Sequence, residues 1–174
     1  MKRILRRDRQ PGGLTCAFTG HRPNKYPWLS MPDSEAYQKL KQRLRGAVEQ
    51  LIGEGYTHFI SGGALGVDTL AALTVLEERD ANPFLTLEMA LPCPSQTRYW
   101  SARDRQIHER LCAQADALTW ISEIYTPFCM YERNRFLVEA CQTLIAVCDG
   151  TPGGTRMTVG LAYDEGKRII TLAP

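Results

Sequence analysis

Six short apolar runs alternate with longer amphipathic segments along this chain. Apolar runs of about four to eight residues bounded by turn residues indicate buried strands, and apolar residues at three- and four-residue spacing indicate helices. The expected strands are residues 14–20, 56–61, 84–92, 117–122, 143–150 and 167–174. The alternation predicts an α/β, Rossmann-like three-layer domain with a mostly parallel sheet of about six strands.

Five amphipathic segments fill the intervals between these strands. In the first of them Leu40 and Leu44 repeat at helical spacing, and Asp33 or Ser34 can serve as the N-cap. The expected helices are residues 34–53, 68–79, 96–115, 131–141 and 155–165. Because no linker or internal repeat divides them, we expect residues 14–174 to form a single domain.

Residues 1–13 form a basic N-terminal arm, in which five basic residues stand against one acidic residue. The arm carries a net charge of +4, so the formal +2 of the chain leaves −2 for residues 14–174. A slightly acidic body argues against long contacts with duplex DNA, although the arm could touch phosphates or simply be a solvated end. With no signal core and no apolar stretch of about 20 residues, we expect a cytosolic protein without membrane contact.

The six cysteines are scattered without any CxxC pair, and most lie in apolar surroundings, which indicates buried thiols. His21, His58 and His108 could in principle join them at a zinc ion, but no ligand spacing supports such a site. We therefore predict no metal and no resident cofactor.

Three glycine-bearing segments follow expected strands: TGHRP, SGGALGVD and DGTPGGT. Ligands bind beyond the carboxyl ends of strands in an open parallel sheet, so these segments should converge on one crevice. Glycines let backbone N–H groups approach an anion, and the next helix presents its positive end, so a phosphate-bearing ligand is expected. The residues expected to bind it are Thr19, Gly20, His21, Arg22, Ser61, Gly62, Gly63, Gly66, Asp68, Asn134, Arg135, Gly153, Gly154 and Thr155.

Several of these residues have a second interpretation. Asp68 either caps a helix or accepts a ribose hydroxyl, and His21 either bonds loop backbone or serves a phosphate or a proton transfer. Residues 153–155 would also suit a plain turn, and one of Arg133 and Arg135 is expected to be a surface charge. Neither GxGxxG nor GxxxxGK[ST] occurs, which disfavours an ordinary dinucleotide dehydrogenase or a P-loop enzyme.

Taken together, TGHRP, SGGALGVD, RNR and DGTPGGT resemble the YpsA/YoqJ-like proteins of the SLOG superfamily, which also holds DprA (SMF) and the LOG "lysine decarboxylase" enzymes. The resemblance covers residues 15–174. It implies a Rossmann-like fold, a pocket for a nucleotide or an ADP-ribose-like ligand, and a homodimer.

This chain departs from two family patterns. Leu65 stands where the DprA signature has arginine, which weakens a DNA-binding inference because a phosphate contact is missing. The LOG enzymes cleave the N-glycosidic bond of nucleoside monophosphates and carry PGGxGTxxE with a catalytic glutamate. Aligning the Gly-Thr pair puts Thr158 at that position, so hydrolysis of this type lacks its acid.

Three functions stay open at this stage. The first is a binding protein for a nucleotide or nucleotide derivative, held by its phosphate. The second is an N-glycosidic hydrolase of nucleoside phosphates, with His21, Asp68 or Glu132 as candidate acid–base groups. The third is a DprA-like protein that binds single-stranded DNA, which the absence of an aromatic and basic stripe does not favour.

Overall fold

A computed structural model describes residues 2–5 and 13–174, with side chains for residues 13–174. Its centre is one sheet with the strand order β1-β5-β4-β3-β2-β6-β7, in which every pairing among these residues is parallel. The strands are β1 (Lys2–Leu5), β2 (Leu14–Gly20), β3 (Tyr56–Ser61), β4 (Thr86–Leu91), β5 (Ala117–Trp120), β6 (Thr143–Val147) and β7 (Arg168–Leu172). All six predicted strands are present.

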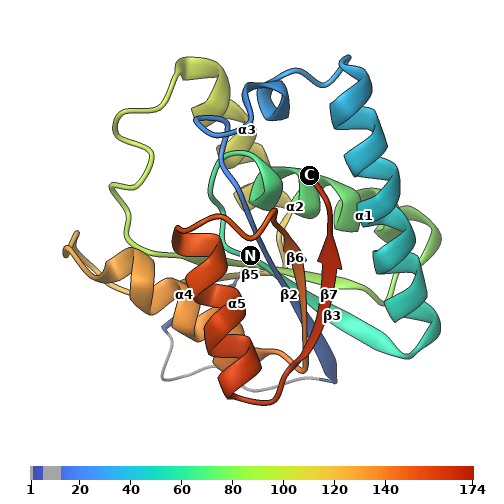
Figure 1. Ribbon diagram of the computed structural model, residues 1–174. Helices are drawn as coiled ribbons and strands as arrows, with labels where there is room; N and C mark the ends of the chain where they lie inside the picture. The colour runs from blue at the N-terminus through green and yellow to red at the C-terminus, as the bar shows by residue number, and fades with distance from the viewer. Residues whose placement is uncertain (1, 6–12) are drawn as a thin grey trace.

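Helices cover both faces of this sheet (Figure 1). Side chains of α1, α2 and α3 pack with one face of the strands, and side chains of α4 and α5 pack with the other. The helices are α1 (Glu35–Gly53), α2 (Val67–Ala81), α3 (Ala102–Gln114), α4 (Cys129–Ala140) and α5 (Gly154–Asp164), with a short 3-10 helix η2 (Pro27–Ser30) after β2. The predicted three-layer α/β, Rossmann-like fold is thereby confirmed.

Two elements differ from the prediction. Residues 2–5, assigned to the basic arm, form β1 and pair with β5 at the edge of the sheet. Half of this strand consists of the charged residues Lys2 and Arg3, so it lacks the apolar run by which the other strands were predicted. Its pairing with β5 is a long-range contact that a local sequence pattern does not reveal. Residues 6–12 lie outside the described part of the chain, so the extent of the arm and the domain boundary stay predictions.

Helix α3 begins six residues later than expected from residue 96, at Ala102. Turns occupy the chain from Pro94, and the Ser101 hydroxyl then accepts the Asp104 N–H at 3.1 Å as the N-cap. At α1 the expected cap is confirmed, since the Ser34 hydroxyl accepts the Tyr37 N–H.

The strand order fixes where a ligand site can form. From β2 the chain adds β3, β4 and β5 on one side, then returns to the other side of β2 for β6 and β7. Loops leaving β2 and β6 therefore diverge to opposite faces of the sheet, which opens a crevice at their carboxyl ends. The local sequence pattern predicts the strands, but the crevice depends on this order.

All six cysteines are free thiols, and four of them are buried. Within the part of the chain that the structure describes, no group of three His, Cys, Asp or Glu side chains could hold a metal ion. The helices among the described residues include none that is long and apolar enough to cross a bilayer.

Candidate ligand-binding site

A cavity of about 510 Å³ opens at this crevice, between the loops after β2 and β3, the first three turns of α4 and the start of α5. Its volume lies within the range of small-molecule sites. Its lining residues are Thr19, Gly20, His21, Arg22, Asn24, Lys25, Ala64, Asp68, Pro127, Met130, Tyr131, Arg133, Asn134, Leu137, Gly154, Thr155 and Met157. The charged lining groups are three cations and one carboxylate, a balance that favours an anionic ligand.

An ion pair between Arg133 and Asp68 forms the floor of the cavity. Arg133 Nη1 donates to Asp68 Oδ2 at 2.8 Å, and each residue is only 5% exposed. The Ala64 N–H donates to the same oxygen at 3.2 Å, while α2 has no side-chain cap, so the carboxylate serves the glycine-rich loop rather than the helix end. Arg133 Nε is buried and has no hydrogen-bond partner among the described residues.

Gly62 makes room for this pair. A Cβ at Gly62 would lie 1.6 Å from Arg133 Nη1 and 2.7 Å from Asp68 Oδ2, so no side chain fits there. Its neighbour Ser61 is buried, and its hydroxyl donates to the Asp68 carbonyl at 2.8 Å and accepts the Gly63 N–H at 3.2 Å. The SGGALGVD loop thus positions the Arg133–Asp68 pair.

Gly66 fixes the loop that follows β2. Its φ of +88° is in the left-handed region, and a Cβ there would lie 2.7 Å from the His21 carbonyl oxygen. The Val67 N–H donates to that same carbonyl. The second glycine loop therefore supports the first, and Gly66 itself does not line the cavity.

Asp149, which follows β6, anchors one side of the cavity. Its carboxylate accepts hydrogen bonds from Lys25 Nζ at 2.8 Å, from the Tyr26 hydroxyl at 2.5 Å and from the N–H and hydroxyl of Thr151. These donors hold the pKa of Asp149 well below its usual value. The network joins the loop after β2 to the loop after β6.

His21 belongs to the same network. Its Nε2 lies 3.2 Å from Asp149 Oδ1 and 3.4 Å from Lys25 Nζ. Burial and the Lys25 ammonium lower its pKa below the usual 6.5, against the opposing effect of Asp149. His21 is therefore a neutral imidazole at the cavity wall near pH 7.

Helix α5 points its N-terminus at the cavity. Gly154 and the buried Thr155 line the cavity, and no side chain caps the helix at Gly153. Uncapped N–H groups at a helix start attract anions. Asn134, from the second turn of α4, lies on the same cavity wall.

The structure brings together eight of the fourteen residues predicted to bind the ligand. These are Thr19, Gly20, His21, Arg22, Asp68, Asn134, Gly154 and Thr155. Four others, Ser61, Gly62, Gly63 and Gly66, lie in the supporting glycine loop. Gly153 is exposed beside the cavity, and Arg135 faces solvent, where it pairs with Glu139 at 3.0 Å. The catalytic candidate Glu132 is exposed and does not line the cavity.

The sequence reasoning missed Arg133, Lys25, Tyr131 and Asp149. Arg133 could have been found, because it shares helical spacing with the buried residues Cys129 and Phe136, whereas Arg135 does not. Asp149 and Lys25 could not have been found from the sequence, because the hydrogen bond between them joins residues that are 124 positions apart.

Comparisons with known proteins point to one family. A family model described as the YspA SLOG family matches residues 16–164. The chain is 30% identical over 137 residues to the uncharacterized SPbeta prophage-derived protein YoqJ of Bacillus subtilis, covering 71% of this chain and 80% of that protein. It is also 28% identical over 154 residues to a UPF0398 protein of Bacillus thuringiensis, covering 87% of this chain and 83% of that protein.

The fold is similar to that of two solved DNA processing proteins A (DprA). The DprA of Streptococcus pneumoniae superposes with a TM-score of 0.60 at 17% identity, over 91% of this chain and 50% of that one. The DprA of Helicobacter pylori, described with a unique single-stranded DNA binding mode, superposes with a TM-score of 0.61 at 21% identity. This match covers 91% of this chain and 64% of that one. This chain thus spans half and just under two thirds of those proteins, and the likeness concerns the fold alone.

Proposed function

We propose that this chain, which belongs to the YspA SLOG family, binds a nucleotide or nucleotide derivative by its phosphate in the cavity described above. The observation that carries the proposal is the charge of the cavity lining, where three cations stand against the single carboxylate of Asp68 and Arg22 has no carboxylate partner among residues 13–174. An anionic ligand would pair with this guanidinium.

The phosphate is best accommodated near Arg22 and the start of α5. Lys25 and Arg133 each have a carboxylate partner, whereas Arg22 has none among residues 13–174, where its side chain hydrogen-bonds only to Met130 Sδ at 3.8 Å. Its guanidinium is therefore free to pair with phosphate oxygens while the N–H groups of α5 approach from the other side.

A ribose fits beside the floor pair. Both hydrogen bonds that the Asp68 carboxylate accepts among the described residues reach Oδ2, so Oδ1 remains for a hydroxyl donor, and Asn134 also lines the cavity. This arrangement supports the ribose-binding interpretation of Asp68 over the helix-cap interpretation.

A thermal-shift panel tests the proposal. AMP, ADP, ATP, cyclic nucleotides, NAD and ADP-ribose are added to the purified protein, and at 100-fold above Kd a ligand should add roughly 2.7 kcal/mol of stability. Arg22→Ala should lose the shift, while Arg135→Ala, which removes a surface arginine paired only with Glu139, should keep it. No shift with any ligand would contradict the proposal.

Ligand binding should weaken as pH rises. A bound anion favours the imidazolium of His21, so binding raises its lowered pKa and takes up a proton. Affinity then falls by at most about tenfold per pH unit as pH passes through the free and bound pKa values. Calorimetry between pH 5 and 8 measures this change in affinity. ADP-ribose is the ligand of choice because it lacks a terminal phosphate, which would itself titrate at about pH 6.

His21→Asn is the control for this pH dependence. It keeps a polar side chain that does not titrate, so its affinity profile should be flat. An unchanged slope in His21→Asn would assign the proton to another group.

Single-stranded DNA binding is the second candidate, and the likeness to the Helicobacter DprA fold favours it. Fluorescence anisotropy with an oligothymidylate, at two salt concentrations, tests it, because phosphate contacts make affinity salt-dependent. Hydrolysis of the LOG type has less support. Thr158 is fully buried and its hydroxyl donates to the Gly154 carbonyl, so it offers no acid. The homodimer and the cytosolic location stay predictions.

A further inference from the structure

We propose that Tyr131 and Met157 form a subsite for the base of the ligand, an inference that rests on the proposed function. Both side chains line the cavity, and although large and apolar they are 39% and 38% exposed. Apolar surface that borders a cavity is commonly covered when the ligand binds.

The lining of the cavity combines two kinds of side chain. The phosphate and sugar candidates are Arg22, Thr155 and Asp68. The apolar lining consists of Pro127, Met130, Tyr131 and Met157. A sugar phosphate alone would leave this apolar lining uncovered, whereas a ligand with one anionic end and one flat apolar end would contact both kinds of side chain.

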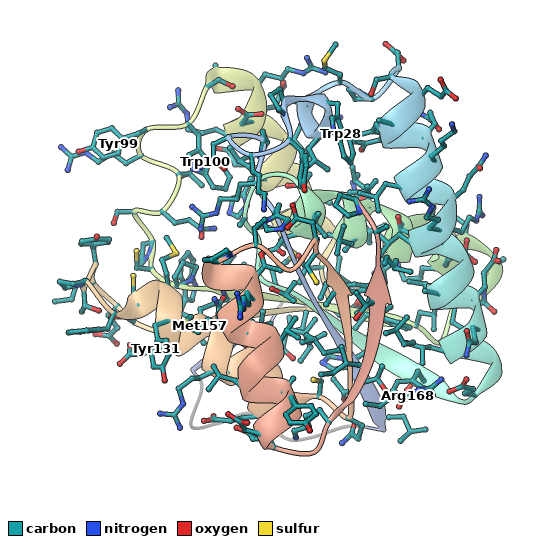
Figure 2. The ribbon with its side chains drawn as sticks, viewed as in Figure 1. Trp28, Tyr99, Trp100, Tyr131, Met157 and Arg168 are labelled. Carbon is teal, nitrogen blue, oxygen red and sulfur yellow. The ribbon has the colours of Figure 1, made fainter. Side chains whose placement is uncertain are left out.

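The fold brings Tyr131 and Met157 to the same cavity. Tyr131 lies in the first turn of α4 and Met157 in the first turn of α5, and both line the same cavity; Figure 2 labels the two side chains on these helices. An aromatic face and a polarizable thioether are both suited to a planar heterocycle, because stacking and sulfur–aromatic contacts favour flat rings.

Arg22 contacts the apolar lining. Its Nη2 lies 3.8 Å from Met130 Sδ, while its charge has no carboxylate partner within residues 13–174. A phosphate paired with Arg22 would thus lie beside the apolar lining. The order phosphate, sugar and base of a nucleotide matches this arrangement.

The charges near Tyr131 favour a mononucleotide over a strand of nucleic acid. Glu132 follows Tyr131 on α4 and is exposed, and Glu123 is exposed on the β5–α4 loop that precedes this helix. A phosphate backbone continuing past the base would meet these carboxylates, and like charges repel. A single base at Tyr131 avoids them.

Paired calorimetric titrations test this subsite. The probes are AMP, GMP and UMP against ribose 5-phosphate, which lacks only the base, and an oligothymidylate serves as the nucleic-acid probe. The wild type should bind the nucleotides more tightly than ribose 5-phosphate. Tyr131→Ala should weaken nucleotide binding by about 5- to 150-fold, the usual value of base stacking, and leave ribose 5-phosphate within about twofold.

Two further variants complete the design. Tyr131→Phe keeps the ring and should bind the nucleotides as the wild type does. Tyr163→Ala removes an aromatic ring that is 78% exposed on α5 and does not line the cavity, so it should change nothing.

The outcomes separate the subsite from the proposed function. If ribose 5-phosphate binds as tightly as AMP, or Tyr131→Ala weakens both equally, the base subsite is wrong and phosphate binding stands. If the wild type binds neither ribose 5-phosphate nor any of the three nucleotides, the subsite is wrong, and the proposed function fails with it when the thermal-shift panel is also negative. If only the oligothymidylate binds and depends on Tyr131, the apolar lining serves nucleic acid and the mononucleotide proposal is overturned.

Discussion

Replacing Arg133 with methionine is expected to destabilise the folded protein by about 3–5 kcal/mol, because it leaves the Asp68 carboxylate buried without its cation. Both residues are 5% exposed and their Nη1 and Oδ2 atoms are 2.8 Å apart. Methionine fills a similar elongated space, so lost packing contributes little. Urea denaturation followed by circular dichroism measures the change in the free energy of unfolding.

The double variant Asp68→Asn/Arg133→Met separates the lost charge pair from lost packing. Removing both charges should recover most of the stability, since asparagine keeps an acceptor for the Ala64 N–H and carries no charge. This double variant should still fail to bind the nucleotide, because the cavity no longer has the positive charge of Arg133.

Arg135→Met, two residues along the same helix, is the matched control. Arg135 pairs with Glu139 at the surface, so its removal should change stability by no more than about 0.5 kcal/mol. A cost below about 1 kcal/mol for Arg133→Met, with no recovery in the double variant, would show that the pair does not stabilise the fold.

The contrast between Arg133 and Arg135 shows what sequence patterns can predict. Helical spacing with Phe136 indicates that Arg133 faces the protein, but its partner Asp68 lies 65 residues away. The glycine loop was predicted as a place where backbone N–H groups meet a phosphate. In the structure Gly62 provides the space that the guanidinium of Arg133 occupies, which no local pattern could reveal, and phosphate binding by the loop stays a prediction.

The strands and helices were predictable because each has a clear apolar period, and β1 was missed because it has none. The Asp149 network could not be predicted for a different reason. It depends on β6 pairing with β2, which brings residues 25 and 149 together across the crevice. Strand order is decided by long-range packing. The loops could therefore be predicted from the local sequence, whereas the way in which they meet around the cavity depends on the topology of the sheet.

Replacing Gly62 with alanine is expected to cost about 3–5 kcal/mol of stability and to abolish nucleotide binding. The new Cβ would stand 1.6 Å from Arg133 Nη1 and 2.6 Å from its Cζ, so the guanidinium must move away from Asp68. Displacement separates a buried ion pair, and the crowding adds the penalty of overpacking.

The position of the clash explains why small adjustments do not relieve it. Gly62 follows β3 directly, in a loop held by the Ser61 hydroxyl, and it is buried itself. Arg133 in turn is 5% exposed on α4, so neither backbone can shift without disturbing the packed layers. Chemical denaturation and the nucleotide thermal shift measure the two losses separately.

Two comparisons make the Gly62 result specific. Gly46→Ala lies in the exposed face of α1 with nothing within 4 Å of the new Cβ, so it should stabilise the protein by about 0.5–1 kcal/mol. In the Asp68→Asn/Arg133→Met background, Gly62→Ala should cost at least about 1 kcal/mol less than in the wild type, because the guanidinium it displaces is gone. If the cost were the same in both backgrounds, Gly62 would be required for its backbone and not for the space that it leaves to Arg133.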